Sequence, residues 1–486
     1  MAAYSVPEHI RALKPKGTMV KAIKNGYYVY ACTNRKGEDG KWRLKMGSVI
    51  GSIKEGVGFI PNDNFCTGEK VSVVEYGQYA IAYEASKCVL ARLKEFFNPL
   101  DATRIYLLAL LFMVNGHTSL KNISELFLQS CLSVRYPTVS MSYGVLSDLL
   151  DALGRREDRP LQYQQHLLDE SCRIAIDGHC IESYSHENDL AQYGNKYRTT
   201  GEMQINVLMA YDLDTHKPVL ARMYPGGMVD KTSVKDLMGS FAFKGKLIIA
   251  DRGFHSLENL SLFTSNGNQY IIPLSENLLE YKAAKDNLDY KRSFIYRTNK
   301  KMHPVFYWEA ETAGEDGSRV ILYKDMNRSA EEEEAFGKRI GTSGKYTPER
   351  LEALKPSFGV FILKTSLANN TAEEIFCLYK QRWGIESYFD LVKNRDEFKA
   401  LCFQDYYRGQ GLAFIILITG QIEQAFRSAC PKMPGKTPDD ILLEARGVKI
   451  KKKKNDGWEA ANYSKKLIEL FAFFKCPLIG DLHLVT

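Results

Sequence analysis

The stretch NNTAEEIFCLYKQRWGIESYFDLVKNRDEF, residues 369–398, predicts one long helix. Asn370 or Thr371 can cap its N-terminus, acidic residues suit its first turn, and no proline interrupts it. At about 100° per residue, four of its side chains share an arc of about 60°. They are Tyr379, Arg382, Glu386 and Lys393. This edge suits a site where metal and phosphate meet, and the alternative is a solvated helix face with spaced ion pairs.

The spacing Tyr-x-x-Arg-x-x-x-Glu-x-x-x-x-x-x-Lys resembles the YREK signature of the DDE transposases of bacterial insertion sequences, and all four positions match. In that family the Glu is the third metal-binding carboxylate, which implies this role for Glu386. The other three residues handle the end of the transposon DNA, which implies DNA contacts for Tyr379, Arg382 and Lys393. The resemblance also implies two further carboxylates upstream, at the ends of strands.

Two strand endings can supply these carboxylates. SCRIAIDG, residues 171–178, is a short apolar run that leads to Asp177, and KGKLIIADRGF, residues 244–254, places Asp251 after another such run. The order strand-Asp, strand, strand, helix, strand-Asp matches a ribonuclease-H-like core. An Asp-Gly after a strand is more often a simple turn, but two acidic strand ends followed by Glu386 favour the catalytic interpretation. Three competing carboxylates lie in turn or cap contexts and rank lower: Asp212, Asp214 and Asp230.

The pattern of elements indicates an α/β protein. We expect an RNase H-like mixed sheet flanked by helices, with a β-rich insertion before the last catalytic helix, a β-rich N-terminal module and a helical N-terminal domain. The expected boundaries are 1–75 for the β-rich module, 78–155 for the helical domain, 171–276 for the first part of the catalytic core, 277–356 for the insertion, 357–425 for the second part of the core and 426–486 for a helical C-terminal region.

Three flanking features have two interpretations each. The basic N-terminal module either grips the DNA backbone or presents a solvated strand face. The helical domain contains two amphipathic segments around a Pro-containing break, which form either a helix-turn-helix or a helical hairpin without DNA. The basic run from Lys449 to Lys454 is either solvated and mobile or neutralises phosphates.

Composition is that of a soluble globular protein, with 45% hydrophobic and 25% charged residues in a chain of 486. The 65 basic residues against 58 acidic ones give a net charge of +7, which permits nucleic-acid binding without establishing it. None of the ten cysteines forms a Cys-x-x-Cys, which argues against a disulfide framework or a zinc ribbon. The N-terminus has no secretory signal and the apolar runs are too short to span a bilayer, so we expect a bacterial cytoplasmic protein that associates with the nucleoid through DNA.

Cutting a phosphodiester requires an activated nucleophilic oxygen and relief of charge on the leaving 3′ oxygen. Two Mg²⁺ ions about 3.5–4 Å apart provide both, and carboxylates suffice as protein ligands. The resemblance implies that Asp177, Asp251 and Glu386 bind these ions and that Mn²⁺ can substitute. No His-Cys spacing supports a metal site at the histidines near these residues. Those histidines are His179, His186 and His255.

The remaining candidate residues would contact DNA. Arg382 suits a two-pronged phosphate contact, Lys393 acts as a point charge, and Tyr379 can hydrogen-bond a phosphate or stack on the terminal nucleotide. Arg252 belongs to the Asp-Arg-Gly-aromatic sequence that the family commonly carries. Some relatives form a DNA hairpin and hold a flipped base on a tryptophan, for which Trp308 is the candidate; a Trp that covers a sheet face is the alternative.

These observations lead to the hypothesis of a DNA transposase that binds terminal inverted repeats, cleaves the element ends and joins the 3′ ends to target DNA. The resemblance implies a homodimer in the complex that pairs the two ends. One alternative is an RNase H-like nuclease without strand transfer, which leaves the Tyr, Arg and Lys spacing unexplained. The other is a catalytically idle DNA-binding regulator, whose expected mark, a lost carboxylate, is absent from the sequence.

Overall fold

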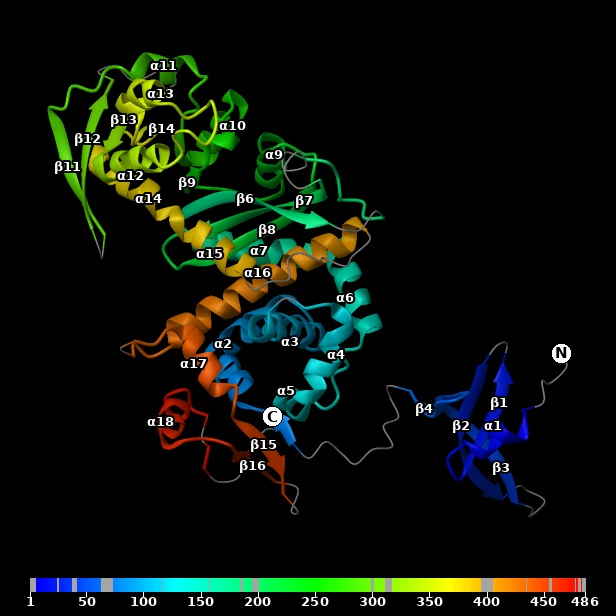
Figure 1. Cartoon of the computed structure of the whole chain (residues 1–486). Helices are drawn as coiled ribbons and strands as arrows, with labels where there is room; N and C mark the ends of the chain where they lie inside the picture. Colours follow the sequence, from blue (N-terminus) through cyan, green and yellow to red (C-terminus); the bar gives the residue numbers. More distant parts are fainter. Residues whose placement is uncertain are drawn as a thin grey trace. The chain divides into compact units, whose positions relative to one another are not determined.

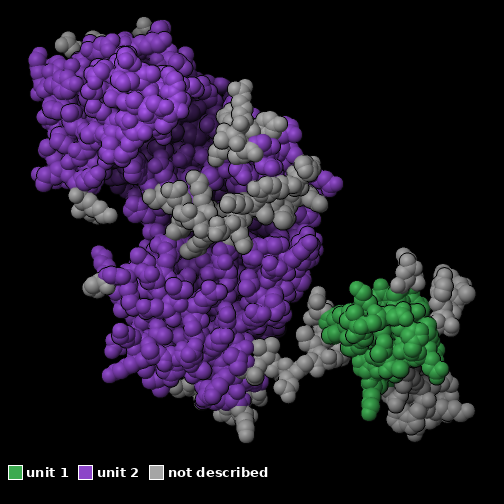
Figure 2. All heavy atoms as spheres, in the orientation of Figure 1, with its two compact units in different colours: residues 1–72 green, residues 73–486 purple. Residues whose placement is uncertain are grey.

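The computed structural model describes most of the chain, in two compact units that comprise residues 1–72 and 73–486 (Figure 2). The described residues are 6–23, 26–36, 42–62, 73–116, 118–156, 158–183, 187–194, 201–298, 301–310, 317–394, 405–433, 435–453, 457–476, 478, 479 and 482.

The N-terminal unit is an antiparallel sheet with one short helix. Its elements are α1 (Glu8–Ala12), β1 (Thr18–Ile23), β2 (Gly26–Lys36), β3 (Trp42–Lys54) and β4 (Gly58–Pro61). The strands pair in the order β1-β2-β3-β4. Ile10 of α1 packs with Val29, Ile50 and Ile53, so one face of the sheet forms a small core under the helix. The β-rich module predicted from the alternating pattern is confirmed.

The second unit is built on a mixed sheet of nine strands (Figure 1). The strands are β6 (Arg173–Ser183), β7 (Met203–Asp212), β8 (Lys217–Pro225), β9 (Leu247–Ala250), β10 (Gln269–Pro273), β11 (Arg292–Arg297), β12 (Met302–Glu309), β13 (Arg319–Asp325) and β14 (Val360–Thr365). They pair in the order β11-β12-β13-β14-β10-β9-β6-β7-β8. The antiparallel β6-β7-β8 meander and the parallel strands β6, β9 and β10 form an RNase H-like core, so the predicted fold class is confirmed.

The strands of the predicted insertion extend this same sheet. β13 pairs with β14, and β14 pairs with β10 of the core, so β11, β12 and β13 continue the sheet beyond this core. Trp308 on β12 packs against a small apolar cluster that contains Leu322 and Ile362. The insertion is therefore joined to the core by backbone hydrogen bonds.

Helices surround the sheet and form a layer of their own (Figure 1). They are α2 (Gly77–Phe96), α3 (Pro99–Asn115), α4 (Leu120–Gln129), α5 (Cys131–Arg135), α6 (Tyr143–Arg155), α7 (Asp158–Glu170), α9 (Asp230–Ser240), α10 (Leu257–Thr264), α11 (Leu279–Ala284), α12 (Met326–Gly337), α13 (Pro348–Leu354), α14 (Ala372–Gln381), α15 (Trp383–Asn394), α16 (Tyr406–Ala429), α17 (Pro438–Ala445) and α18 (Lys465–Phe473). The apolar α16 packs against β8 on one side and against α2, α3 and α6 on the other. Among the helices of the described chain, none has the length and apolar character that crossing a bilayer requires.

Much of the lysine-rich run near the C-terminus is a strand. β15 (Lys449–Lys452) lies between β16 (Trp458–Ala461) and β5 (Val73–Glu75) in a separate three-stranded sheet. Ile450 is buried in this sheet, and Lys451 pairs with Glu459 at 2.8 Å. The interpretation of these four residues as a mobile run is therefore wrong, because alternate side chains of the run can be buried when it adopts a strand. Lys454 lies outside the described residues.

Two helices of this unit touch through glycines. A Cβ added at Gly154 of α6 would lie 1.9 Å from the Tyr407 carbonyl oxygen of α16. A Cβ added at Gly411 of α16 would lie 2.1 Å from the Leu150 carbonyl oxygen of α6. The two helix backbones therefore approach each other at a distance that only glycine permits.

Gly154→Ala is expected to lower the free energy of unfolding by about 2–3 kcal/mol, because α6 and α16 must separate to admit the methyl group. Gly144→Ala, near the start of the same helix, meets nothing within 4 Å. That control is expected to stabilise the protein by up to about 1 kcal/mol through helix propensity. Thermal unfolding measures both variants, and equal melting temperatures would contradict the close helix contact.

Candidate active site

Asp177 lies within strand β6. The sequence predicts that this strand ends at the Asp-Gly pair, but β6 continues to Ser183 and pairs with β7 along its whole length. That prediction is wrong because the long pairing with β7 outweighs the turn preference of Asp-Gly. The Gly178 N–H donates to the Asp177 carboxylate at 2.8 Å, which holds one of its oxygens.

Asp251 follows β9 directly, as the sequence predicts. β9 runs parallel to β6, and Ile176 lies opposite Ala250 in their register. The next residue of each strand is the candidate carboxylate, so Asp177 and Asp251 come side by side at the same level of the sheet.

Asp230, which ranked lower in the sequence, also lies beside this pair. It begins α9, and burial together with the charge of Asp251 raises its pKa. A Cβ added at Gly253 would lie 2.8 Å from the Asp230 Oδ2 atom, so the glycine after Arg252 makes room for this carboxylate. The sequence ranks this residue below the other candidates because its position at a helix start has an ordinary capping explanation.

Glu386 lies on α15, after a break in the predicted helix. Thr371 and Glu374 form a capping box that begins α14, as the sequence predicts, but α14 ends at Gln381 and α15 begins at Trp383. At the break, the Arg382 N–H donates to the Tyr379 carbonyl, and the Arg382 carbonyl accepts from the Ile385 N–H. Each bond joins residues three apart, as in a 3₁₀ turn, instead of the four of an α-helix. The prediction of one continuous helix is therefore wrong at Arg382.

Arg382 lies between two of the three candidate carboxylates. Its Nη1 atom is 3.4 Å from the Asp177 Oδ2 atom, and its Nη2 atom is 2.5 Å from the Glu386 Oε1 atom. The residue is 8% exposed, and its Nε atom is buried with no hydrogen-bond partner in the described chain. The guanidinium group also lies 5.7 Å from the centre of the Tyr379 ring. The turn therefore directs the Arg382 guanidinium toward the candidate carboxylates. The Nε–H of this guanidinium is left without an acceptor among the described residues.

The acidic group carries more negative charge than this arginine can neutralise. Burial raises the pKa of Asp177 to about 6, although Arg382 and the Gly178 N–H act to lower it. The neighbouring carboxylates Asp251 and Glu386 raise this pKa further. Like-charged groups that share one buried place repel each other, so the site favours an additional cation.

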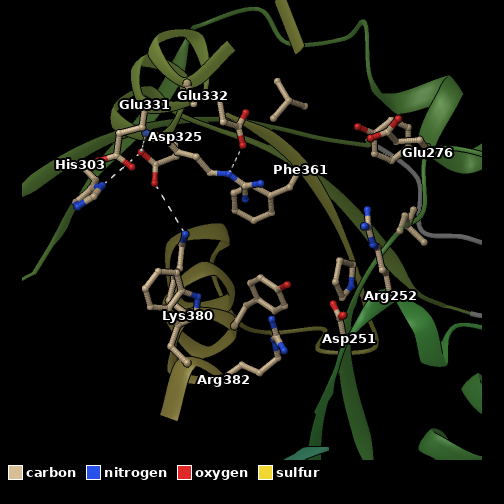
Figure 3. A pocket seen from close by; sticks show the side chains of 18 residues that line it. Asp251, Arg252, Glu276, His303, Asp325, Glu331, Glu332, Phe361, Lys380 and Arg382 are labelled. Carbon is tan, nitrogen blue, oxygen red and sulfur yellow. Dashed lines mark hydrogen bonds and ion pairs between the residues drawn. The ribbon is translucent and has the colours of Figure 1, made fainter. Parts of the chain in front are cut away.

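A cavity of about 680 Å³ opens beside Asp251 and Arg382 (Figure 3). Its wall carries the rings of Phe361, Tyr379 and Trp383. Its cationic side chains are Arg252, Arg328, Lys380 and Arg382, and its acidic ones are Asp251, Glu276, Asp325, Glu331 and Glu332. Residues of α14, of the predicted insertion and of the core strands thus line a polar cavity with an aromatic wall, next to the candidate carboxylates.

The far side of the cavity ties α14 to the insertion. The Lys380 Nζ atom lies 3.9 Å from the Asp325 Oδ2 atom, and 5.4 and 5.1 Å from the ring centres of Phe361 and Phe376. Burial lowers the pKa of Lys380. His303 contacts the other oxygen of Asp325 at 3.4 Å (Figure 3). These contacts hold the last turn of α14 against the end of β13.

The other predicted residues are placed in different ways. Arg252 is exposed and lines the cavity. Trp308 packs in the apolar cluster of the insertion and is not among the cavity residues, whereas Trp383, 63% exposed, lines the cavity. Lys393 belongs to α15, but its side chain lies outside the described residues, as does His186. His179 lies against the Phe389 ring, with ring centres 5.5 Å apart.

The donor set suits a hard divalent cation, since carboxylate oxygens are the ligands that Mg²⁺ prefers. In the part of the chain that the structure describes, no three His, Cys, Asp or Glu side chains are gathered closely enough to hold a metal ion. The Arg382 guanidinium lies between Asp177 and Glu386. Asp177, Asp251 and Glu386 are the carboxylates that could hold such a cation.

The chain matches the protein family described as the transposase DDE domain over residues 169–418, which is about half of its length. The chain belongs to the DDE transposase family. The matched range contains β6, β9, α14 and α15, so it includes the elements that carry Asp177, Asp251 and Glu386.

No curated protein matches the sequence of this DDE transposase. A solved structure of the piggyBac transposase synaptic complex with hairpin DNA is similar to it with a TM-score of 0.37 and 11% identity, over 76% of this chain and 77% of the other. The RNase H-like assignment therefore rests on the strand order of this protein itself.

Proposed function

We propose that this protein is the transposase of a bacterial insertion sequence of the YREK type, and that it cleaves the ends of its element and joins them to target DNA. The observation that carries the proposal is that Asp177 and Glu386 both contact Arg382 and that Asp251 lies beside Asp177, inside the matched DDE domain.

In the proposed reaction, a water oxygen attacks the phosphorus at the element end. The bond from phosphorus to the 3′ oxygen breaks, and this oxygen takes up a proton. The freed 3′-OH then attacks a phosphodiester of the target and displaces the target's own 3′ oxygen. Bound Mg²⁺ would activate the attacking oxygen and stabilise the leaving one.

The chain's own residues would position the DNA. Arg382 has a spare Nε donor next to the carboxylates, so its guanidinium can hold a phosphate oxygen once it turns from Asp177. Tyr379 lies beside it on the cavity wall and offers a ring and a hydroxyl to the terminal nucleotide. Arg252 lines the same cavity. The cavity volume of about 680 Å³ is within the usual range for sites that take a small organic group such as a nucleotide.

A strand-transfer assay with the wild-type protein tests this function. The substrate is labelled DNA that carries the element's own terminal repeats, with Mg²⁺ or Mn²⁺ and a supercoiled target plasmid. We expect cut ends and covalently joined products, and pre-cut ends with a free 3′-OH should join without the first step. A protein that cleaves the uncut ends but does not join the pre-cut ends would be a nuclease. Binding without either reaction would identify an idle regulator.

A further inference from the structure

The net positive charge of the protein is concentrated in its N-terminal unit. Residues 1–72 contain 12 Lys and Arg against 6 Asp and Glu, which is +6 of the total +7. The far larger second unit is thus almost neutral. A small, strongly basic unit on a neutral enzyme is expected to have a polyanionic partner.

The sheet of this unit has one covered and one open face. The face under α1 carries Val20, Val29 and Ile53, which pack around Ile10. Cross-strand partners share a face of a sheet, so the pairing register defines the residues of the opposite face. One row across it is Lys21, Tyr28, Ser52 and Ile60, and the next is Met19, Tyr30 and Val49.

This open face presents aromatic and aliphatic groups to solvent together with the cation of Lys21. Tyr28 is 40% exposed, and Val49 and Ile60 are each 39% exposed. The Lys21 Nζ atom lies 6.0 Å from the centre of the Tyr30 ring. Among the described residues, the Tyr28 ring lies alongside Gly26 on its own strand, which has no side chain to cover it. The face thus combines exposed rings and aliphatic groups with a lysine, on a unit whose net charge is +6.

The two tyrosines have the spacing of a stacking platform. Residues two apart on a strand are about 7 Å apart, which matches successive nucleotides of an extended single strand. Proteins that bind single strands combine such aromatic side chains with cations that follow the backbone. In a duplex the base faces are hidden, so a flat aromatic face favours unpaired bases over double-stranded DNA.

We propose that the open face of the β1–β4 sheet, centred on Tyr28 and Tyr30, binds single-stranded DNA by base stacking, with Lys21 beside the backbone. This site is separate from the phosphoryl-transfer chemistry of the carboxylates. It would hold an unpaired segment of DNA, such as the strand released when an element end is opened.

Fluorescence anisotropy with the full-length protein and a labelled oligothymidylate tests the site. Asp177→Asn is included in every variant so that DNA is not cut. Replacing both tyrosines by leucine (Y28L/Y30L) is expected to weaken single-strand binding roughly tenfold or more, because two stacking contacts are lost. The double phenylalanine variant (Y28F/Y30F) keeps both rings and is expected to bind like the parent protein.

A matched control and a mapping experiment locate the effect. Tyr143, 49% exposed at the start of α6 in the other unit, serves as the control, and Tyr143→Leu is expected to leave the affinity unchanged. Photocross-linking with an oligonucleotide that contains 5-iododeoxyuridine should label Tyr28 or Tyr30. Unchanged affinity of the leucine variant, cross-links confined to the second unit, or a leucine variant that changes only the oligomeric state would each overturn the proposal. None of these outcomes depends on strand cleavage, so the test is independent of the transposase assay.

Discussion

Replacing Asp177 or Asp251 by Asn, or Glu386 by Gln, is expected to lower the rate of cleavage at element ends roughly a thousandfold or more in Mg²⁺. The substitutions keep the size of each side chain and remove one negative charge. Phosphoryl transfer of this kind depends almost wholly on positioned charge, so the loss of one oxygen ligand is not compensated by its neighbours. Gel analysis of labelled element ends measures the rate.

The same assay needs a control carboxylate away from the site. Glu258, at the start of α10, forms an exposed ion pair with Lys235. Glu258→Gln is expected to cleave at the wild-type rate, since an exposed pair contributes little. Circular dichroism shows whether each variant is folded. Full cleavage by any one of the three site variants would remove that residue from the assignment.

Arg382→Gln is expected to have opposite effects on metal binding and on cleavage. In the protein without DNA, Arg382 lies between Asp177 and Glu386, where a divalent cation would compete with it. Two unit charges about 4 Å apart repel by about 4 kcal/mol at an effective dielectric constant of 20. Removing even a third of this repulsion would strengthen the binding of the divalent cation roughly tenfold. The affinity for Mn²⁺, measured by calorimetry, should therefore rise, and cleavage should fall because a phosphate contact is lost.

Arg252→Gln is the matched control for this prediction. Arg252 lines the same cavity and directly follows Asp251 in the chain. Among the described contacts, it forms no ion pair with Asp177 or Glu386. Its removal should change Mn²⁺ affinity much less than that of Arg382. Equal affinities of the wild-type protein and the Arg382→Gln variant would show that the guanidinium does not occupy the metal position.

Much of the element order could be predicted because the signals are local. The apolar run that ends before Asp251 is β9, and the apolar stretch after the catalytic helix is the buried α16. The capping residues of α14 are those that the sequence indicates. Periodicity and caps depend on neighbours within a few residues, so one sequence suffices to find them.

The errors occur where distant contacts override such local signals. At Asp177 the pairing with β7 carries the strand through an Asp-Gly that favours a turn. At Arg382 the helix breaks where the side chain reaches two carboxylates, and Gly384 follows within two residues. A Cβ at Gly384 would lie 3.3 Å from the Tyr211 ring, so this turn is packed closely against β7. Helical periodicity contains no information about such contacts.

The sequence by itself determined which groups are candidates for the chemistry and on which kind of element each lies, because residue type and short-range periodicity are properties of the chain. Only the tertiary structure decided that Asp177 and Asp251 are neighbours, that Arg382 lies between Asp177 and Glu386, and that the insertion continues the catalytic sheet. Those arrangements arise from strand pairing and burial between segments far apart in the chain, whose register is set by the packing of the whole unit.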